Sequence, residues 1–304
     1  MRVAAFDCGT NSLRLLIADI EDKSFREVFR GMEIVRLGQG VDKTGEFHPD
    51  AIARTFAGVD MFVNELRRRG VEKIRFCATS ATRDAKNRDL FLEGVHKRLG
   101  VYPEVISGDE EAALSFQGAC RQLSPTQAPF LVVDIGGGST EFVFGSEKVE
   151  ASKSVNIGCV RMSERHFHTD PPTLAQIGLA ISDIKDAINA AAVVVPITQA
   201  KTLIAVAGTA TTVAAAALGL DRYDPNAIHL SRIPAAKVHE ISQMFIAMTH
   251  AERAALPYMH VGRVDVIAAG ALVLSQIMDA TDAEEFVASE SDILDGMAWS
   301  LAKS

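Results

Sequence analysis

Two short segments, far apart in the chain, share one pattern, and this repeat most constrains the fold. The first covers residues 7–12 (DCGTNS) and the second covers residues 134–140 (DIGGGST). Each follows an apolar run and precedes strand-like residues, so each predicts a β-hairpin with a tight turn. Glycine lets a backbone approach a ligand closely, and the amides of such a turn bind anions. The repeat therefore favours a duplicated domain that holds a phosphoryl group from both sides.

The composition is typical of a globular protein large enough for two domains. The 304 residues are 48% hydrophobic and 23% charged. No apolar run is long enough to span a membrane, and Asp7 comes too early for a signal peptide. The four cysteines are scattered, without a C-x-x-C pair. We therefore expect a cytoplasmic protein with reduced thiols and no membrane partner.

The net charge of −8 is unevenly distributed. Residues 1–127 contain 19 basic and 19 acidic side chains, whereas residues 128–304 contain 12 basic and 20 acidic ones. Any long anionic substrate should therefore lie along the first half of the chain and not the second. Nucleic acid is not an expected partner, because aromatic residues make up only 6% and do not alternate with basic ones.

The order of predicted elements restarts once. After the first hairpin, alternation between Phe25 and Leu37 predicts two further strands, and residues 41–48 read as a loop. Helices and strands then alternate, beginning with a helix that starts at Pro49. Residues 122–129, with two prolines, mark a boundary. The sequence thus predicts an α/β fold with mixed sheets in two domains, 1–127 and 128–304.

Helices predicted over 235–248 and 263–278 offer apolar stripes for a homodimer, although such stripes more often form core. A last strand is predicted at 286–288 and a last helix at 292–301.

Several residues are candidates for binding phosphate. Residues 208–209 lie where a strand meets a helix N-terminus, which favours an anion but also suits an ordinary capped helix. Arg14 can reach the ligand or the solvent, depending on which way its strand faces. The candidates are Gly9, Thr10, Asn11, Ser12, Arg14, Gly136, Gly137, Gly138, Ser139, Thr140, Gly208 and Thr209.

Three carboxylates lie within or beside these turns. Asp7, Asp134 and Glu141 can hold Mg²⁺ directly or through water, or they can cap turn amides. The metal interpretation is favoured for Asp134 and Glu141, and Asp7 is included with them.

Two further positions can take part in chemistry. Glu110 and Glu111 open a predicted helix, where carboxylates stabilise the helix dipole; one that faces a ligand could instead accept a proton from water. Arg83 follows a strand, where a guanidinium can clamp a phosphate bidentately.

These motifs resemble the exopolyphosphatase / guanosine pentaphosphate phosphohydrolase (Ppx/GppA) family. Besides the two turns, residues 107–112 (SGDEEA), 158–161 (GCVR) and 263–270 (RVDVIAAG) look like family motifs, in the same order along the chain. The family belongs to the superfamily of actin, Hsp70 chaperones and sugar kinases. The resemblance implies two ribonuclease-H-like domains around an interdomain cleft, and a final helix, about residues 290–304, that can pack back on the first domain.

The resemblance also implies roles for single residues. Glu111 would be the general base, Asp134 and Glu141 would bind magnesium or position the water, and Arg83 would contact phosphate. The implied activity is release of terminal orthophosphate from inorganic polyphosphate by metal-assisted attack of water. The chain stops at Ser304, without the C-terminal extension of some members, so short polyphosphate is the expected substrate. Cys8 replaces a larger apolar residue and is expected to be buried.

Three alternatives remain open from the sequence. The chain could convert guanosine pentaphosphate to tetraphosphate, since nothing marks or excludes a guanine pocket. It could be a small-molecule kinase of the same superfamily, or a non-catalytic scaffold driven by nucleotide.

Overall fold

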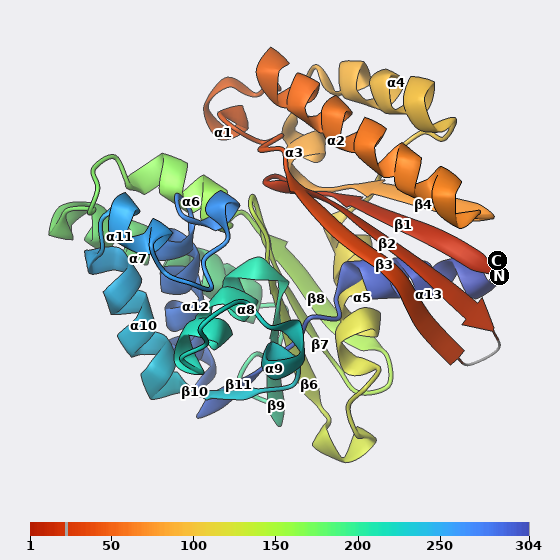
Figure 1. Ribbon diagram of the computed structural model, residues 1–304. Coiled ribbons are helices and arrows are strands. Elements are labelled where there is room, and N and C mark those ends of the chain that lie inside the picture. The colour runs from red at the N-terminus through yellow and green to blue at the C-terminus, as the bar shows by residue number, and fades with distance from the viewer. Residues whose placement is uncertain (22–23, 304) are drawn as a thin grey trace. The chain divides into compact units, whose positions relative to one another are not determined.

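The chain folds into two compact units, each built on one mixed sheet (Figure 1). The computed structural model describes residues 1–21 and 24–303. Unit 1 comprises Met1–Gly118 together with the C-terminal residues from Ile293, and unit 2 comprises Ala119–Asp292. The domain boundary predicted from the sequence, between residues 127 and 128, lies later in the chain than the boundary between Gly118 and Ala119 in the structure.

The sheet of unit 1 has the strand order β3-β2-β1-β4-β5. Its first three strands are antiparallel neighbours, whereas β4 runs parallel to β1 and β5 runs parallel to β4. The strands are β1 (Arg2–Cys8), β2 (Ser12–Glu21), β3 (Ser24–Ile34), β4 (Lys73–Ala78) and β5 (Glu104–Val105).

The prediction of two further strands between Phe25 and Leu37 is wrong. One long strand, β3, pairs with β2 from Ser24 to Ile34, and Gly31 lies inside it without forming a turn. Val35 and Arg36, beyond its end, donate backbone hydrogen bonds to the carbonyl oxygen of Asn11 instead of forming a strand. The predicted loop at residues 41–48 also contains a short helix, α1 (Val41–Thr44).

Helices cover both faces of this sheet. The helices of unit 1 are α2 (Pro49–Arg69), α3 (Ser80–Asp84), α4 (Arg88–Leu99), α5 (Gly108–Cys120) and α13 (Ile293–Lys303), besides α1. As the sequence predicts, α2 begins at a proline and ends where Gly70 adopts the left-handed conformation, with φ at 64°.

Alternate residues of β1 pack on opposite faces of the sheet, because neighbouring side chains of a strand point in opposite directions. Ala4 and Phe6 join the core cluster that also contains Phe62 of α2. Val3 and Ala5 join the cluster that contains Trp299 of α13. Figure 1 shows α2 and α4 on one face and α13 on the other. The apolar character of β1 on both faces thus follows from its central position.

The sheet of unit 2 repeats this arrangement. In the order β8-β7-β6-β9-β11, the first three strands are antiparallel neighbours and the next two run parallel to β6, with β10 added at the edge. The strands are β6 (Phe130–Ile135), β7 (Thr140–Gly145), β8 (Val149–Val155), β9 (Thr202–Val206), β10 (Arg232–Pro234) and β11 (Glu285–Ala288). The predicted α/β fold with duplicated, ribonuclease-H-like mixed sheets is confirmed, and the cleft between the domains stays a prediction.

The helices of unit 2 pack around α12, whose residues are almost all buried. Helix α10 packs against α12, so the apolar stripes considered for a homodimer lie in the core. The helical segments are η1 (Pro125–Gln127), α6 (Cys159–His166), α7 (Leu174–Ala192), α8 (Ala207–Ala217), α9 (Pro225–Ile228), α10 (Ala235–Ala247), α11 (His250–Ala254), η2 (Val261–Arg263) and α12 (Ile267–Thr281). Within the described ranges, none of the helices combines the length and the apolar character that crossing a membrane requires.

Close packing of α13 on α5 predicts that Gly296 tolerates no side chain. A Cβ built on Gly296 would lie 2.0 Å from the carbonyl oxygen of Leu114, a backbone atom that cannot move aside. We expect Gly296→Ala to lower the free energy of unfolding by about 1–3 kcal/mol, measured by urea denaturation. The matched control is Gly178→Ala in α7, where the added Cβ meets no atom within 4 Å. Gly178→Ala should be neutral or should raise the free energy of unfolding by up to about 1 kcal/mol. Equal effects of the two substitutions would contradict the packing described for α13.

Candidate active site

The candidate residues of unit 1 follow three strands that end at one edge of the sheet. Cys8 of β1 lies beside Ala78 of β4, and Ala78 lies beside Val105 of β5. Because these strands are parallel, the segments that leave them start at the same edge, where α/β proteins bind ligands. These segments are the first glycine turn, residues 79–83 and residues 106–111.

The first glycine turn is held by its neighbours through backbone hydrogen bonds. The Gly9 amide donates to the Ser12 carbonyl oxygen at 3.0 Å, and the Gly38 amide donates to the Thr10 carbonyl oxygen at 2.8 Å. Gly38 must be glycine, because a Cβ there would lie 2.3 Å from Cγ2 of Thr10. Within residues 1–21 and 24–303, the buried Thr10 hydroxyl finds no hydrogen-bond partner. A buried hydroxyl of this kind suits a site that receives a polar ligand.

Arg14 and Asp7 form an ion pair across the hairpin. They are direct partners in the pairing of β1 with β2, and Nη2 of Arg14 lies 2.6 Å from Oδ2 of Asp7. Both side chains are largely buried. A divalent cation at Asp7 would have to share the carboxylate with a guanidinium, so the geometry favours Asp7 as an ion-pair partner over a metal ligand.

The structure distinguishes the two adjacent glutamates at the start of α5. Glu110 pairs with Arg75 at 2.5 Å, and its side chain is 46% exposed. Glu111 is buried and pairs with Arg83, with Nη1 of Arg83 2.8 Å from Oε2 of Glu111. The same Nη1 also donates to the carbonyl oxygen of Ile106 at 2.9 Å. Glu111 and Arg83 thus come together at the sheet edge beside the first turn.

The glycine turn of unit 2 rests on the start of α6. The backbone amides of Cys159 and Val160 donate to the carbonyl oxygens of Gly136 and Gly137, each at 2.9 Å. Gly158 allows this contact, since a Cβ there would lie 2.3 Å from the Gly137 carbonyl carbon. The carbonyl groups of the turn therefore face α6. The other side of the turn is left for backbone amides that bind an anion.

Gly158 and Arg161 also build this turn, although neither was among the candidates predicted from the sequence. Nε of Arg161 donates to the carbonyl oxygen of Gly138 at 2.7 Å, so this arginine holds the turn from the side of α6. Both residues belong to the GCVR motif at residues 158–161, which contributed only to the resemblance to a known family.

Residues 208–209 lie in the first turn of α8, directly after β9. The helix begins at Ala207, which adopts a left-handed φ of 64°. Arg263 packs on Gly208 so closely that a Cβ there would lie 1.7 Å from its Nη2. A cation beside a helix N-terminus strengthens an anion site, so Arg263 joins the candidates although the sequence did not mark it as one.

Asp134 and Glu141 lie opposite each other on β6 and β7. Asp134 is 6% exposed and Glu141 is fully buried, and the Ser154 hydroxyl donates to Oε1 of Glu141 at 2.7 Å. Directly opposed side chains of this kind are about 4.5–5.5 Å apart at Cβ, where like charges repel. Two carboxylates at this separation fit a divalent cation better than any other arrangement on the two turns.

No cluster of three or more potential metal ligands of the His, Cys, Asp and Glu types is found in the described parts of the chain. A cation at Asp134 and Glu141 would therefore complete its coordination with water or with ligand oxygens, as Mg²⁺ commonly does.

The remaining turn residues differ in how their side chains are engaged. The Thr140 hydroxyl donates to the carbonyl oxygen of Ile157, so its proton is not available to a ligand. Ser139 is buried within the second turn. Cys8 is buried as expected, and burial raises the pKa of its thiol, which keeps it protonated.

Several known proteins are similar to this chain in sequence or in structure. The exopolyphosphatase 2 of Mycobacterium tuberculosis is 48% identical over 99% of this chain and 98% of its own length. The guanosine-5'-triphosphate,3'-diphosphate pyrophosphatase of Vibrio atlanticus is 36% identical over 61% of this chain and 37% of its own length. A crystal structure of an exopolyphosphatase-like protein superposes with a TM-score of 0.96 at 40% identity, covering 100% of this chain and 99% of the other.

The sequence pattern of the Ppx/GppA phosphatase family matches residues 16–304. That match covers nearly the whole chain, and it includes the second glycine turn, Glu111 and both candidate metal ligands. The chain therefore belongs to the Ppx/GppA phosphatase family.

Proposed function

We propose that this protein is an exopolyphosphatase, which releases orthophosphate from the end of short inorganic polyphosphate chains. The proposal is supported by similarity over the full length to a relative of that name. The observation that carries it is the pairing of buried Glu111 with Arg83 at the strand-end edge beside a glycine turn. A carboxylate and a guanidinium side by side supply a proton acceptor and a phosphate clamp.

In the proposed reaction, the oxygen of a water molecule attacks the terminal phosphorus, and Glu111 accepts a proton from that water. The P–O bond to the next phosphate breaks, and that phosphate leaves with the bonding electron pair. Arg83 holds Glu111 in place before substrate arrives. Arg83 contacts the protein through Nη1, so its Nε and Nη2 can donate hydrogen bonds to a phosphoryl group.

The glycine turns and the start of α8 stabilise the charge on the phosphate chain. Such groups act through backbone amides that are already oriented, so little reorganisation is needed when negative charge shifts towards the leaving phosphate.

We propose that Asp134 and Glu141 hold Mg²⁺, directly or through water. When bound, the ion would neutralise charge on the phosphoryl oxygens, as it does in other phosphoryl-transfer enzymes. These residues fit the role because their opposed carboxylates need a cation. Asp7 is not part of this proposed site, because Arg14 already balances its charge.

Guanosine pentaphosphate is the second candidate substrate. The observation that favours it is the similarity of residues in this chain to a guanosine-5'-triphosphate,3'-diphosphate pyrophosphatase. Both substrates end in a phosphoanhydride, so the same catalytic residues would serve either of them.

We further propose that the protein acts in the cytoplasm. Its cysteines are free thiols, and three of them, Cys8, Cys77 and Cys159, are buried. Burial raises the pKa of each of these three thiols, which suppresses the reactive thiolate form. Free thiols are usual in a reducing compartment.

The two adjacent glutamates predict opposite results on mutation. Glu111→Gln should lower kcat for phosphate release by about 10²–10⁴-fold, because the amide cannot accept the proton. Glu110→Gln is the matched control, since Glu110 pairs with Arg75 instead of Arg83, and its kcat should change by less than about threefold. Initial rates of orthophosphate release, with folding checked by circular dichroism, measure both. Wild-type turnover by a folded Glu111→Gln protein would remove Glu111 from the role of base.

The opposed carboxylates predict a metal-dependent change in stability. In chelator, Glu141→Gln should raise Tm by up to about 2 °C, because about 0.2–1 kcal/mol of repulsion is relieved and Oε1 still accepts from Ser154. Mg²⁺ should raise the Tm of the wild type but not that of Glu141→Gln. Thermal unfolding at neutral pH measures both shifts. A Mg²⁺ response that survives in Glu141→Gln and in Asp134→Asn would place the ion elsewhere.

Parallel assays separate the two candidate substrates. We expect release of orthophosphate from short polyphosphate to exceed release from guanosine pentaphosphate in kcat/KM, and we expect both to stop in chelator. Each assay follows orthophosphate over a series of chain lengths, with guanosine pentaphosphate also tested as a competitor. A higher kcat/KM for guanosine pentaphosphate would replace the first candidate with the second.

A further inference from the structure

Arg253 is a charged residue buried inside unit 2. It belongs to the short helix α11, and only 5% of the residue is exposed. Its guanidinium pairs with Asp170, with Nη2 of Arg253 2.6 Å from Oδ1 of Asp170. A buried charge costs free energy unless it is paired and hydrogen-bonded. The contacts of Arg253 therefore show which parts of the chain this residue holds together.

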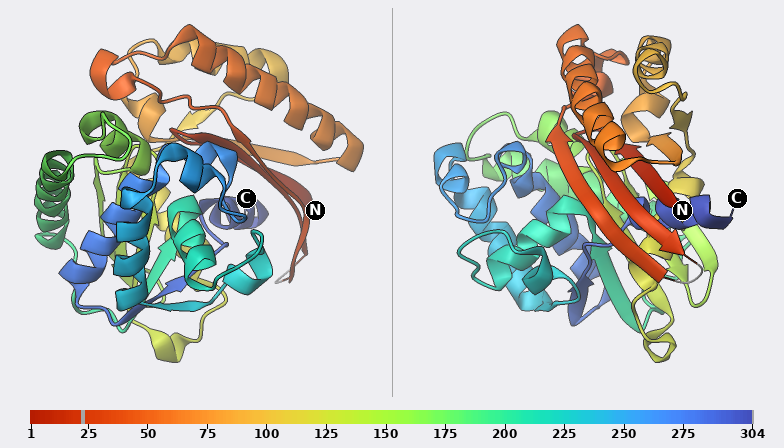
Figure 2. Two further views of the ribbon diagram at one scale, coloured as in Figure 1. Left: turned by 60° about the vertical axis from the view of Figure 1, so that its left-hand side comes forward. Right: turned by 45° about the vertical axis from the view of Figure 1, so that its right-hand side comes forward.

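The remaining donors of Arg253 bind backbone carbonyl groups. Nη1 donates to the carbonyl oxygens of Phe245 and Met248, at 3.2 and 2.5 Å, at the end of α10. Nε donates to the carbonyl oxygen of Val264 at 3.0 Å. Helix α10 packs against α12 in the core of unit 2 (Figure 2). Arg253 thus joins Val264 to a well-packed part of the unit, through donors that the planar guanidinium holds in fixed directions.

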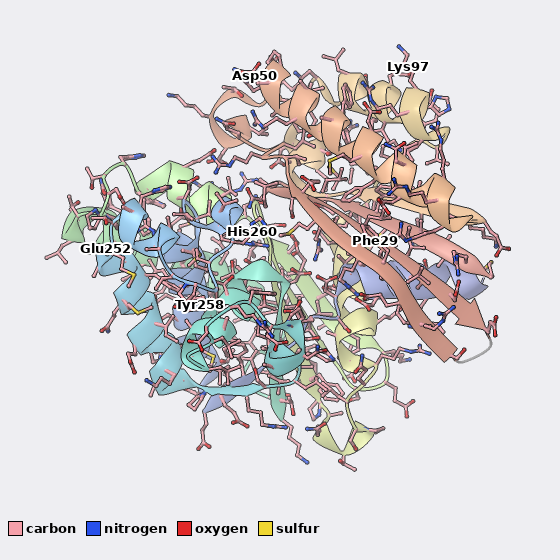
Figure 3. All side chains as sticks on the ribbon, in the orientation of Figure 1. Phe29, Asp50, Lys97, Glu252, Tyr258 and His260 are labelled. Atoms are coloured by element: carbon pink, nitrogen blue, oxygen red, sulfur yellow. The ribbon has the colours of Figure 1, made fainter. Side chains whose placement is uncertain are left out.

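Val264 directly follows η2, the turn that contains Arg263. In Figure 3, Glu252 of α11 and His260 mark the two ends of the segment that leads to η2. Residues 255–266, all of which the structure describes, contain η2 and no other helix or strand. The position of such a segment depends on side-chain contacts more than on a ladder of backbone hydrogen bonds, and Arg253 supplies a buried contact of this kind.

This segment places Arg263 beside the starts of two helices. Its guanidinium packs on Gly208 in the first turn of α8, where an added Cβ would lie 1.7 Å from Nη2. Burial raises the pKa of the Cys159 thiol, and the charge of Arg263 opposes that rise, so the guanidinium also lies near the start of α6. The Cys159 amide in turn supports the second glycine turn. Arg263 is therefore close to both candidate anion sites of unit 2.

We propose that Arg253 and Asp170 are positioning residues of the candidate active site. Through the Val264 carbonyl group they hold Arg263 against the start of α8, where it binds a phosphoryl group. This role rests on the proposed function, because phosphate is the ligand assigned to α8. Neither positioning residue touches the ligand, so loss of either should weaken binding and raise KM more than it lowers kcat.

Substitution of Arg253 by lysine keeps the charge but removes the planar fork of donors. An ammonium group cannot reach all of these acceptors together, so Arg263 should shift. Arg253→Lys should raise KM for short polyphosphate by about 5–20-fold and change kcat by less than about threefold. Arg232→Lys is the matched control, because Arg232 pairs with Glu285 at an exposed site, and its KM should stay within about twofold of the wild type. Circular dichroism and urea denaturation check that each variant is folded.

A double-mutant cycle separates positioning from a general loss of stability. If Arg253 acts through Arg263, Arg253→Lys should cause no further rise in KM when Arg263→Ala is already present. A general loss of stability would lower activity in either background. Asp170→Asn is a second probe that should fold readily, because the Asp170 side chain is 42% exposed. It should raise KM by about 2–5-fold, again only when Arg263 is intact.

Binding of short polyphosphate in chelator gives a readout that does not depend on turnover. Isothermal titration calorimetry should show Kd rising in the same variants and in the same pattern over the cycle. A wild type that binds polyphosphate without releasing phosphate in Mg²⁺ would contradict the proposed function, and the Kd cycle would still decide the role of Arg253. Unchanged KM and Kd in folded Arg253→Lys, or equal effects of this substitution with and without Arg263, would overturn the positioning role. A wild type that binds no polyphosphate would contradict both proposals.

Discussion

The shared edge of the parallel strands is the constraint on which the candidate site depends. In unit 1, β1, β4 and β5 end side by side, so a glycine turn, Arg83 and Glu111 start from neighbouring points. In unit 2, β6 and β9 do the same for the second turn and the start of α8. Backbone amides at such an edge are oriented before any ligand arrives, which is what binding a phosphate chain requires. Substitutions that disturb the strand pairing should therefore damage the site even when they lie far from it.

The two units share a fold, but their corresponding hairpins carry different charged side chains. The aspartate before each glycine turn faces a cross-strand partner, and that partner is Arg14 in unit 1 but Glu141 in unit 2. Asp7 consequently has a counter-charge within the protein, whereas Asp134 lies opposite a second, fully buried carboxylate. A cation between Asp134 and Glu141 would reduce the repulsion between their opposed carboxylates. We infer that the aspartates of the two copies have separate roles: Asp7 pairs with Arg14, whereas Asp134 helps to hold a metal ion.

Local signals in the sequence were sufficient for much of the fold. Pro49 and Gly70 mark the ends of α2 because their backbone preferences are local, and the two hairpins follow from glycine between apolar runs. Alternation alone could not show that β3 is one strand, because the pattern continues whether or not a turn interrupts it. The pairing of Arg83 with Glu111 depends on the order of strands in the sheet, which no local pattern specifies. The sequence could propose both residues but could not separate Glu111 from Glu110.

Attack of water on the terminal phosphorus is the central claim, and an isotope experiment tests it most directly. Polyphosphate is hydrolysed in ¹⁸O-labelled water under single-turnover conditions, and the label is located by mass spectrometry. The proposed reaction forms the new P–O bond at the terminal phosphorus, so one solvent oxygen should appear in each orthophosphate released. Label in the shortened chain would place the attack on the other phosphorus. Unlabelled products in both fractions, with phosphate passed to an acceptor, would contradict hydrolysis altogether.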